Sequence, residues 1–235
     1  MRDAFLLSMN KKALIFLIIL AAIAGGFFYF WEVWLPAQIE KEQKMSEEKT
    51  QPPTLFRKED YKIEEREDGK YIIVEKVGLT AKVPEGWRVK IEKGSSYPEP
   101  GYWIRLFSED YKPSSYTITL PGGGCRIDIS GWISQESNQK RKKIIQDLEN
   151  NDTSSVGEIY NKEGYEYRLI KVSGYKGIEQ RNSEDHKLSK FIHLISVDIP
   201  INDENIVTLY IDFPPDNKEK CMEIWKKFLE NVVIE

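Results

Sequence analysis

The sequence predicts an α+β domain in which an antiparallel β-sheet is covered by two helices, preceded by a single N-terminal transmembrane helix. Three observations predict this arrangement. Short segments that alternate apolar and polar residues recur from Tyr61 to the C-terminus, as in half-buried strands. Two stretches have the apolar spacing of amphipathic helices, and an uncharged apolar run lies near the N-terminus. Many antiparallel strands with two helices to cover a sheet face are typical of a layered α+β domain.

The N-terminal run contains no charged residue from Ala13 to Trp31, and it keeps its apolar character up to Leu35 apart from Glu32. At about 1.5 Å per residue, the uncharged run reaches about 28 Å, which is close to the hydrocarbon thickness of a bilayer. We therefore expect residues 13–35 to be a transmembrane anchor or an uncleaved signal-anchor. The cytoplasmic membrane is then a partner of the chain through Ala13–Leu35.

Basic residues precede this run, namely Arg2, Lys11 and Lys12. They favour a cytoplasmic N-terminus, residues 1–12, and an extracytoplasmic C-terminal domain. The alternative is a cleaved signal peptide, because Ala22 to Ala24 have the small-x-small form of a cleavage site. Cleavage there leaves a start rich in aromatic residues, so we expect the segment to be retained.

A charged segment, residues 36–60, is expected to be a linker, and residues 61–235 the extracytoplasmic domain. Tyr61–Glu75 is predicted to form a hairpin that turns at Asp68-Gly69. Two further strands are expected on either side of the turn Pro84–Gly86. The remaining predicted strands are Tyr102–Phe107, Cys125–Ser134, Tyr165–Val172, Tyr175–Arg181, Lys190–Ile199 and Asn205–Phe213.

Two helices are predicted in this domain. The first is Glu136–Glu149, and the second follows Pro214-Pro215, with Asp216 as its cap and Glu219 completing a capping box. The second helix has a broad apolar face, made of Cys221, Met222, Ile224, Trp225, Phe228 and Leu229. Asn231–Glu235 is expected to end the chain as a short strand.

Two segments resemble a known family. "GLTAKVPEGWRVKI", Gly78 to Ile91, resembles the strand-Pro-x-x-Trp-strand signature of the PsbP/Mog1-like domains, and Asn205–Glu235 has a similar order of hairpin, helix and terminal strand. The resemblance covers about residues 71–235. The family often has Tyr before the Pro, where this chain has Val83. The resemblance implies a PsbP/Mog1-like sandwich of an antiparallel sheet with helices on its faces. It implies no catalytic residues, because these domains include photosystem accessory subunits, a small-GTPase-binding protein and exported bacterial proteins.

Composition excludes several classes of function. The net charge is −4, which gives no reason to expect nucleic-acid binding. The sequence has no CxxC, GxSxG, HExxH, P-loop or EF-hand pattern, so we expect no metal site and no cofactor. Its two cysteines, Cys125 and Cys221, are predicted either to form a disulfide in an oxidising compartment or to be two small buried residues.

The segment Gly94 to Ile118 mixes aromatic residues with Pro and Ser. Aromatic side chains in loops stack on sugars or anchor a protein partner, so this segment is the predicted binding site. The alternative is that Trp103 and its alternate neighbours pack into the core. The candidate binding residues are Tyr97, Tyr102, Trp103 and Tyr111.

These observations favour a membrane-anchored extracytoplasmic binding or accessory domain that engages a protein partner or an envelope component. No catalytic residue is assigned. Two alternatives stay open. One is an envelope hydrolase whose site forms only in three dimensions, with Cys125 as nucleophile and His186 or His193 as base. The other is a structural subunit of a larger membrane complex.

Overall fold

The computed structural model describes residues 32, 54–94, 101–113 and 121–235. Pro52–Glu235 form one compact unit. Apart from Glu32, the predicted cytoplasmic N-terminus and membrane anchor lie outside the described residues. Among the residues that are described, no helix is both long enough and apolar enough to cross a membrane.

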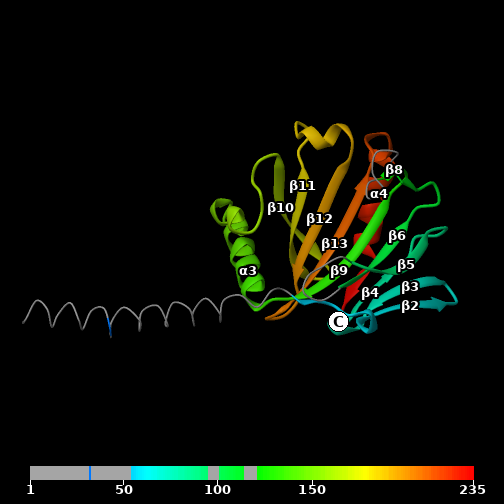
Figure 1. The fold of residues 1–235 in the computed structure, drawn as a ribbon, viewed down its shortest axis with the longest axis horizontal. Coiled ribbons are helices and arrows are strands. Elements are labelled where there is room, and N and C mark those ends of the chain that lie inside the picture. Colours follow the sequence, from blue (N-terminus) through cyan, green and yellow to red (C-terminus); the bar gives the residue numbers. More distant parts are fainter. Residues whose placement is uncertain (1–31, 33–53, 95–100, 114–120) are drawn as a thin grey trace, which may run out of the picture. The chain divides into compact units, whose positions relative to one another are not determined.

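The larger of the two main sheets has eight strands and is antiparallel throughout (Figure 1). Its order is β10-β11-β12-β13-β9-β6-β5, and a short strand, β1, pairs with the end of β9. The neighbours β5–β6, β10–β11, β11–β12 and β12–β13 follow each other in the sequence, whereas β9 pairs with the more distant strands β1, β6 and β13. The strands are β1 (Thr54–Leu55), β5 (Arg88–Lys93), β6 (Tyr102–Phe107), β9 (Arg126–Ile133), β10 (Tyr165–Val172), β11 (Tyr175–Asn182), β12 (His193–Pro200) and β13 (Asn205–Phe213).

The smaller sheet has four strands in the order β14-β4-β3-β2. β14, the last strand, pairs antiparallel with β4. A separate pair of short strands, β7 and β8, completes the described strands. These strands are β2 (Tyr61–Arg66), β3 (Gly69–Val74), β4 (Leu79–Lys82), β7 (Lys112–Pro113), β8 (Pro121–Gly123) and β14 (Val232–Ile234).

Two sheets replace the single sheet that the sequence predicted, and this corrects the predicted fold class. An α+β domain with one antiparallel sheet covered by two helices, as in a PsbP/Mog1-like sandwich, is wrong for this chain. The transmembrane helix predicted before it lies, apart from Glu32, outside the described residues. The smaller sheet itself covers part of the larger one. β4 and β5 show the cause, because they follow each other closely in the sequence and yet belong to different sheets. Alternation predicts where a strand lies, but it does not predict the strand with which it pairs.

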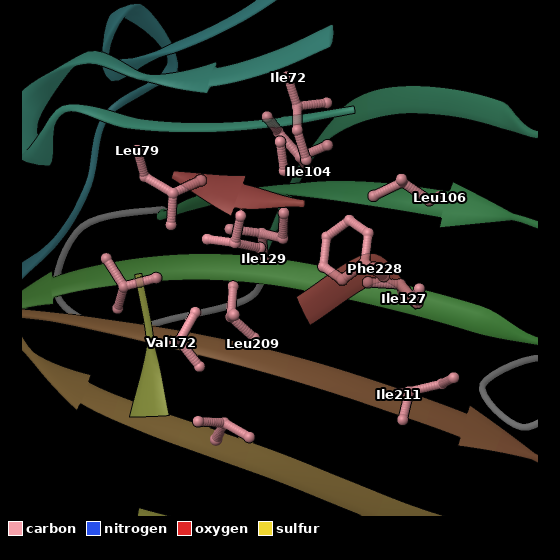
Figure 2. Close-up of a cluster of buried hydrophobic side chains, with 14 of the residues drawn as sticks. Ile72, Leu79, Ile104, Leu106, Ile127, Ile129, Val172, Leu209, Ile211 and Phe228 are labelled. Carbon is pink, nitrogen blue, oxygen red and sulfur yellow. The ribbon is translucent and has the colours of Figure 1, made fainter. Parts of the chain in front are cut away.

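The main hydrophobic core fills the space between the two sheets and the last helix (Figure 2). Ile72 and Leu79 of the smaller sheet are buried against β6 and β9. We call the face of the larger sheet that packs on this core the inner face and the opposite one the outer face. The labelled inner-face and helix residues in Figure 2 are Ile104, Leu106, Ile127, Ile129, Val172, Leu209, Ile211 and Phe228.

Helix α3 (Gln135–Glu149) packs on the outer face, at the edge formed by β10 and β11. Ser134 caps its N-terminus by accepting a hydrogen bond from the backbone of Ser137. Its apolar residues form a second, smaller core with Ile178. Arg141 fixes the helix to the sheet, because its guanidinium lies 2.8 Å from a carboxylate oxygen of the buried Asp198.

Helix α4 (Lys218–Glu230) packs on the inner face and buries Cys221, Trp225 and Phe228 in the main core. These buried residues belong to the apolar face that the spacing in the sequence predicted. The predicted capping box at Asp216 does not form, since the helix begins after Asn217 and that residue makes no side-chain capping bond.

The segment before β2 is tied to the larger sheet. Phe56 is fully buried, although it lies inside the predicted linker. A Cβ atom on Gly131 of β9 would come within 2.1 Å of the Phe56 ring, so only glycine leaves room for this ring. Residues 52–235 therefore contain the whole core, both cysteines and every described strand, and they are the unit for the experiments below.

A disulfide joins Cys125, just before β9, to Cys221 in the first turn of α4. The two Cα atoms lie 5.8 Å apart and the residues are separated by 96 positions in the sequence. The bridge thus connects the larger sheet to the helix that lies on its inner face. Because it closes a long loop, it reduces the conformational entropy of the unfolded chain.

Replacing both cysteines by alanine (C125A/C221A) should lower the free energy of unfolding of residues 52–235 by about 2–5 kcal/mol, as expected for a bridge across a long loop. Urea denaturation measures this change. Reducing agent should destabilise the wild type by a similar amount and leave the variant unchanged. Equal unfolding midpoints for the oxidised wild type and the variant would contradict the prediction.

Candidate ligand pocket beside the C-terminal helix

A pocket with a volume of about 600 Å³ lies between α4 and the inner face of β10 and β11. This volume is within the range of pockets that hold small organic ligands. The apolar lining residues come mainly from α4, which also contributes the charged residues Glu223, Lys226 and Glu230. The opposite side carries charged residues of the β10–β11 hairpin. The pocket therefore has the two environments that an amphipathic molecule needs.

The hairpin places its charged residues by its register. A two-residue turn at Ser173 and Gly174, both with positive φ, connects β10 to β11. Such turns fit the twist of a hairpin. Arg168 then lies directly opposite Glu179, and both side chains point to the inner face. The turn is also held from outside, since the Ser173 hydroxyl accepts a hydrogen bond of 2.9 Å from the backbone of Ile234.

Glu179 is the centre of the charged side and is only 1% exposed. Arg168 donates to both of its carboxylate oxygens, at 2.7 and 3.0 Å. Arg181 donates to it through Nε at 3.0 Å and also through Nη2. A buried carboxylate is stable only when it is paired and hydrogen-bonded, and two guanidinium groups provide this. The cluster keeps a net charge of +1, and the Arg168 side chain is 59% exposed.

The apolar side is one face of α4. Met222, Trp225 and Leu229 follow one another at helical spacing and line the pocket together with Ile170 and Val232. Trp225 is almost fully buried and stacks on Phe228, with 5.9 Å between the ring centroids. Its indole N–H has no acceptor among the residues that the structure describes. The apolar wall therefore contains one unsatisfied donor.

A second hollow, with a volume of about 410 Å³, adjoins the first, and Met222 lines both. Arg181 lines the second hollow and bonds to Glu179, which lines the first. His193 stacks on Phe213 at the same place, with 5.5 Å between the ring centroids. Burial lowers the pKa of His193, and the positive charge of Lys218 lowers it further. The second hollow is more polar than the first.

The predicted aromatic site does not form one surface. Tyr97 lies outside the described residues. Tyr102 and Trp103 are consecutive residues of β6, so their side chains point to opposite faces of the sheet. Tyr102 packs against the main core, while Trp103 lies beside Arg105, whose guanidinium is 4.8 Å from the ring centroid. Tyr111 packs on Phe107. None of the three described residues lines the two hollows.

The described residues also lack the nucleophile that the hydrolase alternative requires, because Cys125 forms a disulfide. Cys125 is fully buried and bonded to Cys221, so it offers no thiol. His186 accepts a hydrogen bond of 3.2 Å from the backbone of Leu188 and lies against Tyr165. His193 is half-buried in the second hollow. These residues do not form a nucleophile–base pair.

A cluster of charged side chains lies on the outer face, on β9 and β13. Arg126 donates to Asp212 and lies 3.7 Å from a carboxylate oxygen of Asp128. Burial raises the pKa of Asp212 to about 7, although Arg126 lowers it, and burial also raises the pKa of Asp128. Asp212 is 0% exposed. A ligand larger than a proton has no access to it, so we assign the ligand-binding role to the inner-face pocket.

Sequence reasoning missed Arg168, Glu179 and Arg181. The signal that identifies them is the Ser173-Gly174 turn between two alternating segments, because a two-residue turn fixes which residues lie opposite each other. The apolar residues of α4 were identified, but as core residues only. Part of that face borders the pocket instead.

Comparison with known proteins gives little beyond this geometry. No family model matches the chain, and no curated protein matches it. The fold is similar to the crystal structure of LpqN, a protein involved in cell envelope biogenesis of Mycobacterium tuberculosis. The two chains are 16% identical with a TM-score of 0.40, and the match covers 74% of this chain and 90% of LpqN. A likeness of this size assigns neither a family nor a function, and the resemblance to the PsbP/Mog1-like domains stays a prediction.

Replacing Asp212 by asparagine tests the outer-face cluster. The pKa of aspartate in an unfolded chain is about 3.9, whereas burial raises the pKa of Asp212 to about 7 in the folded protein. The folded state therefore binds the additional proton between these values. Protonated Asp212 thus stabilises the folded state most below about pH 4. As the pH rises to about 7, the free energy of unfolding should fall by up to about 4 kcal/mol because this contribution is lost. Urea denaturation of D212N across this range should lack this decline.

The matched control is Asp68→Asn, which removes an exposed carboxylate on the smaller sheet. Hydrogen bonds from Tyr71 and Lys82 lower the pKa of Asp68, so its titration lies below this pH range. The D68N variant should keep the slope of the wild type. If the curves of D212N and wild type run parallel from about pH 4 to about pH 7, Asp212 is ionised in the folded protein and the prediction is wrong.

Proposed function

We propose that the protein is a non-catalytic, extracytoplasmic binding domain that holds an amphipathic small molecule in the pocket beside α4. The observation that carries this proposal is the pocket itself, which combines an apolar wall with a paired, buried carboxylate and two arginines. A wall of this kind takes the apolar part of a ligand, and the polar groups orient the rest. Engagement of a protein partner and attachment to the cytoplasmic membrane through residues 13–35 stay predictions.

The disulfide supports the extracytoplasmic location. Disulfides form and persist in secreted proteins and in oxidising compartments, whereas thiols stay reduced in most cytosolic proteins. The bridge between Cys125 and Cys221 joins β9 to the helix that forms the apolar wall. An oxidising compartment is therefore the environment in which the pocket is held as the structure shows it.

The arrangement of the charged side chains supports binding rather than catalysis. A general acid or base needs a free proton-transfer position toward its substrate. Glu179, the buried carboxylate of the pocket, accepts hydrogen bonds from two arginines at both of its oxygens. Both arginines stay protonated at all relevant pH values, so they hold charge and do not transfer protons.

Met222→Trp tests the proposal, because a larger side chain at this position projects into both hollows. Isothermal titration calorimetry of residues 52–235 with decyl maltoside, below its micelle concentration, measures binding of an uncharged amphiphile. The wild type should bind it, and M222W should bind it roughly tenfold more weakly or not at all, since the added ring occupies the volume that the chain needs.

The control is Ile63→Trp, which adds the same ring at an exposed position of β2. I63W should bind as the wild type does. Urea denaturation of both variants shows whether they remain folded. Equal affinities of wild type and folded M222W would overturn the proposed function, and so would a wild type that binds neither uncharged nor charged amphiphiles of this chain length.

A further inference from the structure

The geometry points to an anionic ligand for this pocket, namely a single-chain amphiphile whose carboxylate or phosphate head group contacts Arg168 and whose chain lies along α4. This inference rests on the proposed function and adds the charge and the orientation of the ligand.

The charge around the pocket favours an anion. The lining residues and their direct ion-pair partners include five cations and three carboxylates, which leave a net charge of +2. The cations are Arg168, Lys171, Arg181, Lys226 and Lys227, and the carboxylates are those of Glu179, Glu223 and Glu230. The six charged lining residues are neutral in sum, and the ion-pair partners Arg181 and Lys227 add the two positive charges, whereas the whole chain has a net charge of −4. An anionic head group is attracted to such a site.

Two of the three carboxylates of the pocket, those of Glu179 and Glu223, are paired with cations. Glu179 is buried and accepts bonds from two guanidinium groups, and Glu223 lies 2.7 Å from Lys227. A cation that approached Glu179 would also approach Arg168 and Arg181. Like charges at short distance in a partly buried site repel strongly. The buried carboxylate of the pocket, Glu179, therefore offers no place to a cationic head group.

Arg168 provides the geometry for an anion. Its Nε and Nη2 atoms bond to Glu179, and its side chain is 59% exposed at the edge of the pocket. A guanidinium group has five N–H donors, so donors of Arg168 remain for a second acceptor. Carboxylate and phosphate oxygens match the planar arrangement of these donors. Because Glu179 fixes the guanidinium, little side-chain entropy is lost when the anion binds.

The apolar wall fixes the direction of the chain. Ile170 lies two residues from Arg168 on the same face of β10, and Met222 and Leu229 face it from α4. A chain attached to a head group at Arg168 thus meets apolar side chains on both sides. Burial of its surface supplies the nonpolar part of the affinity.

The experiment compares head groups on one chain length. Residues 52–235 are titrated calorimetrically with decanoate, decyl phosphate, decyl maltoside and decyltrimethylammonium, each below its micelle concentration. We expect both anions to bind roughly tenfold or more tightly than the uncharged amphiphile, and the cation to bind most weakly. Decanoate and decyl phosphate show which of the two anionic head groups the pocket prefers.

Variants of Arg168 separate charge from geometry. R168Q should weaken decanoate binding roughly tenfold and decyl maltoside binding by a clearly smaller factor, while R168K, which keeps the charge but not the planar donors, should show an intermediate loss of decanoate binding. Arg66→Gln is the matched control, since Arg66 is an exposed arginine paired to a glutamate on the smaller sheet. It should leave all affinities unchanged.

Two results would overturn this inference in different ways. If all four amphiphiles bind equally, or if R168Q leaves decanoate binding unchanged, the pocket binds amphiphiles without recognising an anion, and only the inference fails. If none of the four binds, the proposed function fails with it.

Discussion

The position of α4 is the constraint on which the pocket depends, and this helix is held at both ends. At its first turn, Cys221 is bonded to Cys125 beside β9. Directly after its last turn, β14 pairs with β4 in the smaller sheet. Each end is thus tied to a different sheet. A helix held in this way keeps its distance from β10 and β11, so the space between them persists instead of closing by side-chain packing.

The smaller sheet depends on the same connection. β2, β3 and β4 are contiguous in the sequence and would leave an open edge on β4, but β14 occupies that edge. The pairing also brings Ile234 to the hydroxyl of Ser173 at the β10–β11 turn. The hairpin that carries the charged side of the pocket is therefore fixed to the strand that follows its apolar wall.

Burying Glu179 has a cost that the fold meets with two arginines. A carboxylate removed from water loses several kcal/mol of solvation, and ion pairs with good geometry offset this loss without adding much stability. An apolar residue at this position would give similar stability with less constraint. What the ion pairs provide is orientation, because Glu179 holds Arg168 and Arg181 on one face of the hairpin. Such fixed guanidinium groups are better suited to recognising a ligand than to stabilising a core.

Local features of the sequence predicted the elements well, whereas the sheets and the site depend on contacts that the sequence pattern does not show. Tyr102–Phe107 and Asn205–Phe213 are strands with the predicted bounds, and α3 begins one residue earlier than expected. The two sheets were missed because pairing between distant strands leaves no local signal. The aromatic segment was chosen for its composition, yet alternation along β6 separates Tyr102 from Trp103.

The charged side of the pocket, in contrast, follows from the Ser173-Gly174 turn alone. The turn sets Arg168 opposite Glu179, and Arg181 lies two residues further on the same face. That α4 lies opposite this face of the hairpin can be known only from the three-dimensional structure.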